Sequence, residues 1–247
     1  MPPTRQSNPR PSNSRQNESQ HSESQQSEPQ QSEPQQSEPR QLEKTLLYSY
    51  AALYREFVVA SSRQDFLEIR AREIRLLAEE QAYLTEYPDT THWLVVAADD
   101  SPDTLVVLPV LAHIVAAAPH LTLRVVREED AAPLLAGLVD DPALLASWAE
   151  ADLPLLLSFD DEWQFQEPWG PHPQAIEPFL EQWVADHPEA EQLAEDDSPA
   201  GQVAYMRLVE GLMQEMRLWY NSMLNQACGE ELCALLARWR SENGDDQ

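Results

Sequence analysis

Two cysteines are the only residues of this chain that could carry out thiol–disulfide exchange. Cys228 and Cys233 lie five positions apart in a chain of 247 residues. A disulfide needs Cα atoms within roughly 7 Å and converging Cβ atoms. On one continuous helix, five residues turn the side chain by about 140°, which does not suit a disulfide. A break at Gly229 would bring the thiols closer. The spacing therefore favours one buried and one half-exposed thiol over a redox pair.

Carboxylates and one hydroxyl gather in a second segment. Asp99, Asp100 and Asp103 surround Ser101 and Pro102. An oxygen-rich loop could hold a divalent cation, but the other ligands and the glycine of a calcium loop are missing. We interpret Ser101 as a helix N-cap, with Pro102 at the first helical position and Asp103 favourable to the helix dipole.

The remaining polar residues do not form a recognisable metal or phosphate site. The histidines are scattered, and no pair has the His-x-x-x-His spacing of a zinc ligand pair. The chain has six glycines and no phosphate-binding glycine loop. We expect no metal and no cofactor.

The charge balance restricts the partners. The chain has 16 Lys and Arg against 43 Asp and Glu, a formal charge of -27. Such a surface repels nucleic-acid phosphates and anionic membranes, and it favours basic protein partners. The longest apolar run, 105–118, is too short for a membrane span, and the Met1 end has no apolar core of a signal peptide. We expect a cytoplasmic protein without nucleic-acid or membrane partners.

The composition divides the chain near residue 41. Residues 1–41 are rich in Ser, Gln, Glu and Pro, with a repeated pentad from Ser27, and this composition predicts a disordered tail. Order is expected from Leu42. One helix face is predicted through Leu46, Tyr50, Leu53 and Phe57, and a second helix over 62–85.

The middle of the chain alternates between strands and helices. Strands are predicted at 93–98, 121–126, 153–159 and 163–167, the last two as an antiparallel hairpin around Asp160 and Asp161. A helix is predicted at 104–118 with Pro109 inside it. Two short helices are predicted within 131–150, capped by Asp130 and by Asp140 or Asp141, with Pro133 and Pro142 in their first turns. A further helix follows at 174–186.

The last part is predicted to be helical. Apolar residues step by three and four from Val203 to Met223, and a final helix is expected at about 230–241. The methionines of this stripe could line a pliable groove, but we interpret the stripe as core.

Several motifs together resemble a bacterial thioredoxin-like family whose members carry Cys-Gly-Asp-Cys followed closely by Leu-Pro-x-Leu. The motifs are the segment 97–112 with its Leu-Pro-Val-Leu, the strand 121–127, Asp152-Leu-Pro154, Trp169-Gly-Pro-His-Pro173, and the closing helices at 217–221 and 230–236. The resemblance covers roughly 45–240. It implies an α/β thioredoxin-like fold, a four-stranded mixed sheet with flanking helices, with helical additions at both ends. Pro154 occupies the place of the family's cis-proline, and whether its own peptide bond is cis stays open at this point. The expected organisation is a tail 1–41, an N-terminal helical extension 42–90, a core 91–187 and a C-terminal helical extension 188–247.

The departure from this family affects function. Ser101 and Thr104 occupy the positions of its two cysteines, and neither side chain can form a disulfide. The resemblance then leaves protein binding beside the cis-proline, where thioredoxins receive an extended segment by main-chain hydrogen bonds. The expected binding surface consists of Asp100, Ser101, Asp103, Leu153, Pro154, Trp169 and Gly170. Trp169 could equally pack the turn onto the sheet.

Two alternatives stay open. Some thioredoxin-fold glutathione transferases use a serine at the matching helix start, so Ser101 could serve a glutathione- or thiol-handling enzyme. The pair Cys228 and Cys233 could carry a relocated redox function. The preferred prediction is a protein partner that is basic or presents an extended segment, without catalysis by this chain.

Overall fold

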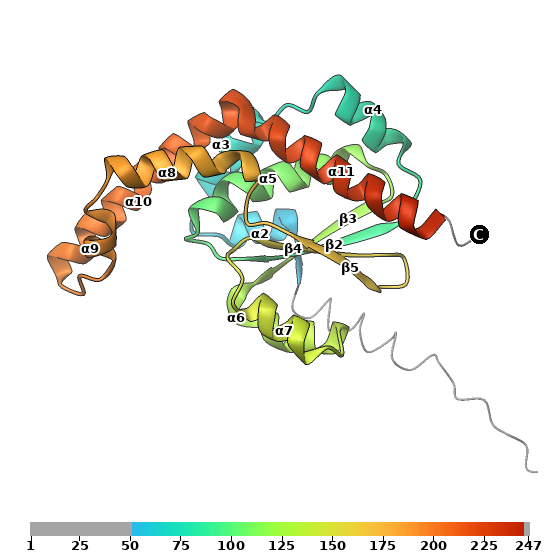
Figure 1. Ribbon diagram of the computed structural model, residues 1–247, viewed down its shortest axis with the longest axis horizontal. Coiled ribbons are helices and arrows are strands. Elements are labelled where there is room, and N and C mark those ends of the chain that lie inside the picture. The colour runs from blue at the N-terminus through green and yellow to red at the C-terminus, as the bar shows by residue number, and fades with distance from the viewer. Residues whose placement is uncertain (1–50, 245–247) are drawn as a thin grey trace, which may run out of the picture. The chain divides into compact units, whose positions relative to one another are not determined.

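The computed structural model describes residues 51–244, which contain a five-stranded mixed sheet between two layers of helices (Figure 1). The strands are β1 (Ala52–Leu53), β2 (Thr91–Ala97), β3 (Leu121–Arg127), β4 (Leu155–Phe159) and β5 (Phe165–Trp169). The helices are α2 (Tyr54–Ala60), α3 (Gln64–Glu73), α4 (Ala78–Glu86), α5 (Pro102–Ala117), α6 (Glu128–Leu138), α7 (Pro142–Ala149), η1 (Gln174–Ile176), α8 (Glu177–Asp186), α9 (Ala190–Ala194), α10 (Pro199–Trp219), η2 (Tyr220–Leu224) and α11 (Asn225–Gly244). The predicted tail lies outside the described residues.

The sheet has the order β1-β3-β2-β4-β5. β2 runs parallel to β3 and antiparallel to β4, and β4 and β5 form the predicted antiparallel hairpin. The α/β class and the four predicted strands are confirmed. β1 adds a short fifth strand, antiparallel to β3. The predicted first helix is therefore wrong for Ala52 and Leu53, because pairing with the edge of β3 replaces helical hydrogen bonds there. Phe57 lies in α2 as expected, and Leu46 and Tyr50 lie outside the described residues.

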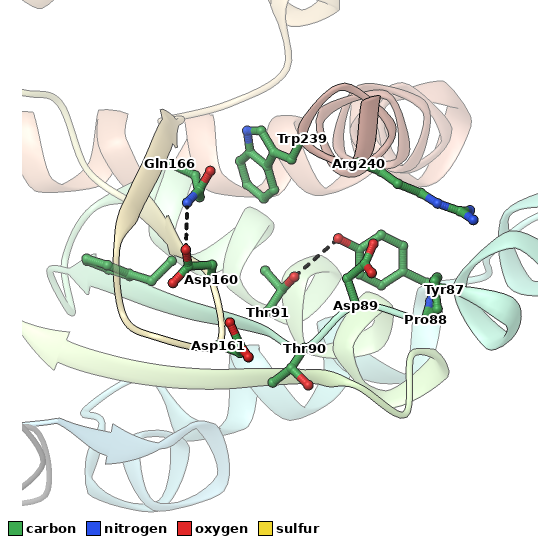
Figure 2. A pocket seen from close by; sticks show the side chains of 11 residues that line it. Tyr87, Pro88, Asp89, Thr90, Thr91, Asp160, Asp161, Gln166, Trp239 and Arg240 are labelled. Atoms are coloured by element: carbon green, nitrogen blue, oxygen red, sulfur yellow. Dashed lines mark hydrogen bonds between the residues drawn. The ribbon is translucent and has the colours of Figure 1, made fainter. Parts of the chain in front are cut away.

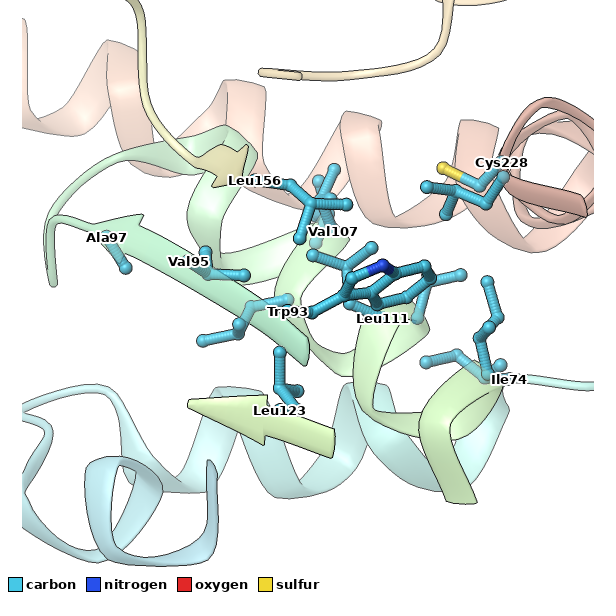
Figure 3. Close-up of a cluster of buried hydrophobic side chains, with 14 of the residues drawn as sticks. Ile74, Trp93, Val95, Ala97, Val107, Leu111, Leu123, Leu156 and Cys228 are labelled. Carbon is cyan, nitrogen blue, oxygen red and sulfur yellow. The ribbon is translucent and has the colours of Figure 1, made fainter. Parts of the chain in front are cut away.

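Strand β2 packs on both faces. Trp93, Val95 and Ala97 belong to the larger core, under α5 and α11, and Figure 3 shows Trp93 beside Leu111 and Val107 of α5. Leu94 and Val96 face a smaller core under α6 and α7. This two-sided burial is the reason why the strand reads as a continuous apolar run.

The helix predicted over 62–85 is wrong as one element. α3 ends at Ile74, whose backbone is extended, and α4 begins after Leu77. Side chains stabilise the break. Arg75 donates from Nη1 to the carbonyl oxygens of Arg72 and Ile74 at 2.7 and 2.6 Å, and Glu80 accepts from the Leu77 N–H at 2.7 Å.

The two short helices after β3 exist, but only one of the predicted starts is right. Asp141 caps α7, accepting from the N–H groups of Ala143 and Leu144, with Pro142 at the first position. α6 begins earlier, at Glu128, so Asp130 lies in its first turn and Pro133 in its interior. The hairpin loop is also longer than two residues. The Asp160 carboxylate accepts from the N–H groups of Glu162 and Gln164 and closes the loop.

The C-terminal helices form one continuous run through the π-helical turn η2. α11 begins earlier than predicted, and Gly229 lies inside it rather than at a break. A Cβ at Gly229 would meet the end of the Glu80 side chain, so a larger residue there would require this carboxylate to move. The apolar stripe is core in its middle, at Met213, Met216 and Tyr220, whereas Met206 and Met223 are exposed.

Candidate functional site

Ser101 ties the start of α5 to the loop before β4. Its Oγ accepts a hydrogen bond from the Thr104 N–H at 3.2 Å, as an N-cap does, and Pro102 occupies the first helical position. The same hydroxyl donates to the carbonyl oxygen of Leu153 at 2.9 Å. The Ser101 proton therefore already has an acceptor, and the helix start is fixed against the residue that precedes Pro154.

The loops before β4 and after β5 meet at a close backbone contact. The Leu153–Pro154 peptide is cis, and so is the Gly170–Pro171 peptide. Gly170 has φ +128°, and a Cβ built on it would lie 2.3 Å from the Pro154 carbonyl oxygen. Only glycine fits this position without strain, because L side chains rarely adopt such φ values.

His172 connects the first turns of two helices. Its Nδ1 lies 3.1 Å from an oxygen of Asp103 in α5, and its Nε2 lies 3.5 Å from an oxygen of Glu177 in α8. Burial disfavours the charged imidazolium, but the hydrogen bonds and charges of Asp103 and Glu177 outweigh burial and raise the His172 pKa. The loop after β5 is thereby joined to the N-terminus of α5.

Trp169 faces α11 with its polar edge. Its Nε1 donates to Glu231 at 3.0 Å, and the same carboxylate accepts from the Gln174 N–H at 2.8 Å. The indole is half-buried and packs against the larger core. A cavity of about 420 Å³ lies beside it, between the loop after β5 and α11, with Glu231 and Arg238 among its walls.

The three aspartates of the 99–103 segment do not converge on one site. Asp99 pairs with Arg127 at 2.7 Å, Asp103 contacts His172, and Asp100 is exposed. Within residues 51–240 there is no group of three side chains that could hold a metal ion. The oxygen-rich segment is thus an assembly of caps and ion pairs.

The structure brings together most of the residues expected at the binding surface. These residues lie in three places that the contacts described above link: Ser101 and Asp103 at the start of α5, Leu153 and Pro154 before β4, and Gly170 after β5. Asp100 is exposed at the edge of this cluster. Thr104 is instead fully buried, and its Oγ1 has no hydrogen-bond partner among the described residues.

Two residues of the cluster were missed in the sequence. His172 stands in the predicted turn motif, at the position where the resembled family has arginine. The motif could therefore have marked this position, but nothing in the sequence indicates the contact between His172 and Asp103. Glu231 accepts the hydrogen bond of Trp169. No sequence pattern marked Glu231, because the two residues are 62 positions apart.

Neither thiol belongs to the loops of this cluster, because both lie in α11. Cys228 is fully buried beside apolar side chains (Figure 3), and Cys233 is half-buried on the same helix. Both are free thiols. Burial raises the pKa of Cys228 well above its usual value and that of Cys233 to about 11. One buried and one half-exposed thiol is the arrangement that the spacing favoured.

A second cavity, of about 580 Å³, opens at the other end of the sheet (Figure 2). Thr91, at the start of β2, and Phe159, at the end of β4, line it, whereas Ser101 follows β2 and Pro154 precedes β4. Figure 2 shows Asp89, Asp160 and Asp161 in its walls. Asp160 closes the hairpin loop through its hydrogen bonds. Because the cavity lies at the opposite ends of β2 and β4, it is separate from the cluster around Pro154.

Comparison with known proteins identifies the family of this chain. Two solved chains match. One is a protein of unknown function from Pseudomonas aeruginosa, which is 18% identical, covers 67% of this chain and 96% of its own length, and has a TM-score of 0.47. The other is an HIV epitope-scaffold, which is 16% identical, covers 78% of this chain and 96% of its own length, and has a TM-score of 0.49. No curated protein matches. Among the described helices, none is long and apolar enough to cross a membrane. A family model described as thioredoxin matches residues 54–184, more than half of the chain. The chain therefore belongs to the thioredoxin family.

Proposed function

We propose that this chain is a protein-binding member of the thioredoxin family that acts without dithiol exchange. The observation that carries the proposal is the hydrogen bonding of Ser101, which caps α5 and donates to the Leu153 carbonyl. At the position where a redox thioredoxin has its nucleophile, this chain has a residue that stabilises the loop.

The two cysteines support this proposal. Thiol exchange requires a thiolate that can reach its target. Cys228 is fully buried, and the raised pKa values of both thiols leave little thiolate at neutral pH. Their places on one helix, five residues apart, also disfavour a disulfide between them.

The proposed binding surface consists of the exposed Asp100 and Gly170 and the half-buried Leu153, around the buried Pro154. The Leu153 carbonyl oxygen accepts one hydrogen bond from Ser101 and has a second lone pair for the N–H of an extended segment. The excess of carboxylates favours a basic segment and disfavours nucleic acid and anionic membranes. We propose a cytoplasmic location, because two cysteines are too few for a disulfide-stabilised secreted domain.

The rival function is glutathione or thiol handling through Ser101. Such a serine would donate its proton to a thiolate, but here the proton goes to the Leu153 carbonyl. Glutathione is also an anion, and Asp100 and Asp103 flank Ser101. These two features favour protein binding over the rival.

An affinity capture with the full chain tests the proposal. The baits are the wild type, Asp100→Arg combined with Leu153→Asp, and Asp161→Arg. The last bait repeats the Asp→Arg substitution on an exposed residue at the other end of the sheet. We expect a protein that the wild type and Asp161→Arg retain at moderate salt and that the double variant loses, with all three baits melting cooperatively.

Two results would contradict the proposal. One is capture that is equal for all three baits, because binding would then not use this surface. The other is binding of reduced glutathione that Ser101→Ala abolishes while the chain remains folded, which would establish the rival function.

A further inference from the structure

A groove of about 420 Å³ lies between α8 and α10, two helices that Figure 1 shows side by side. Three aromatic side chains line it: Phe179 and Trp183 from α8, and Trp219 from the end of α10. The rings of Phe179 and Trp219 have centroids 5.4 Å apart and planes inclined by 37°. These residues share no side chain with the loops around Pro154.

Two carboxylates stand at the same groove. Glu215 of α10 is half-buried, and Asp186 at the end of α8 is exposed. Asp186 accepts one hydrogen bond, from the Gln182 side chain at 3.0 Å. None of the described residues that line the groove is basic. The groove thus combines aromatic faces with uncompensated negative charge.

Trp183 is the buried member of this aromatic set. Its side chain is 8% exposed, and its ring stacks on His187 with the two centroids 4.5 Å apart. Its Nε1 is enclosed and has no hydrogen-bond acceptor among the described residues. The indole therefore adds apolar surface to the groove, and its N–H resonance can report on binding there.

We propose that this groove binds an arginine side chain of a protein partner. A guanidinium is planar, stacks on aromatic faces and donates in a fork to carboxylates, so the rings of Phe179 and Trp219 and the carboxylates of Glu215 and Asp186 match it. This site does not depend on the surface beside Pro154, and each can fail without the other.

Titrations followed by nuclear magnetic resonance test the proposal on the full chain. The probe is the peptide acetyl-Gly-Arg-Gly-amide at 150 mM salt, and the signals are the indole N–H resonances of Trp183 and Trp219, assigned with Trp183→Phe and Trp219→Phe. We expect saturable shifts of both signals. The same peptide with citrulline, an uncharged isostere of arginine, should bind about tenfold more weakly.

Matched variants separate the groove from the general negative field. Glu215→Gln should weaken binding about threefold or more, whereas Glu181→Gln, the same change at an exposed position of α8 outside the groove, should leave it unchanged. Three results would overturn the proposal: no shift of either indole signal, equal binding of the citrulline peptide, or equal losses for the two variants. Tighter binding of tetramethylammonium than of the arginine peptide would also overturn it, in favour of a quaternary ammonium site.

Discussion

At the scale of single residues, the cluster around Pro154 depends on a few specific contacts that other side chains could not make. Ser101 combines the roles of cap and donor, and His172 joins α5 to α8. The resemblance to thioredoxin-like proteins located Ser101, Pro154 and Gly170. The bond between His172 and Asp103 joins residues 69 positions apart, and no local pattern could predict it.

Gly170→Ala should destabilise the fold by about 2 kcal/mol or more, because the new Cβ would meet the Pro154 carbonyl oxygen at a backbone angle that alanine rarely adopts. Gly211→Ala is the matched control. It lies in α10 with nothing within 4 Å of its Cβ position, so it should stabilise by about 0.5–1 kcal/mol. Urea unfolding of both variants measures the two free energies, and equal effects would refute the described contact.

The His172 interactions predict a dependence of stability on pH. Because the folded pKa is raised, His172 favours folding fully below its unfolded pKa of about 6.5, and the contribution disappears as the pH rises through the folded value. The difference in unfolding free energy between wild type and His172→Gln should therefore be largest near pH 5.5 and shrink toward pH 9. In an Asp103→Asn background this change with pH should be much smaller. A difference that grows with pH would contradict the assignment.

At the scale of elements, local patterns predicted what depends on neighbours in sequence. The buried strand β2, the capped start of α5 and the β4–β5 hairpin followed from apolar runs, caps and turn residues. The gap between α3 and α4, the edge strand β1 and the turn η2 did not, since distant or cross-strand contacts stabilise them. The gap, for example, is fixed by hydrogen bonds from Arg75 and to Glu80 that a helical periodicity does not reveal.

Arg70 makes the clearest example of a contact between distant elements. Its side chain is fully buried, lies 5.4 Å from the centre of the Tyr220 ring, and donates to Asn221 and Asn225 around η2. Burial lowers its pKa to about 10, still well above neutral pH. The guanidinium thus holds α3 to the junction of α10 and α11.

Arg70→Ala should lower the free energy of unfolding by about 2–4 kcal/mol, because it leaves a cavity and removes the donor of both asparagines. Arg72→Ala is the control on the same helix. Its side chain is 76% exposed and pairs with Glu68 at 3.4 Å, so its loss should cost less than about 0.5 kcal/mol. Thermal and urea unfolding would measure both, and similar costs would show that Arg70 does not join the helices.

At the scale of the whole molecule, the chain keeps a thioredoxin fold but carries its cysteines elsewhere. The sheet, its two cores and the clustered loops are built without a dithiol, and both thiols belong to α11. The fold class was predictable because many local features along the chain, such as apolar strands, helix caps and turn residues, each indicate the same fold. The partner was not, because only its charge and its extended form are suggested by this sequence.

The central claim is that binding beside Pro154 needs no thiol. The most direct test is the affinity of the full chain with Cys228→Ala and Cys233→Ala for the protein captured by the wild type, measured by calorimetry under non-reducing conditions. The account predicts a Kd equal to that of the wild type within about twofold, since the buried Cys228 and the half-buried Cys233 lie outside the proposed surface. Loss of binding by this variant while it still unfolds cooperatively would contradict the account and would assign the interaction to thiol exchange.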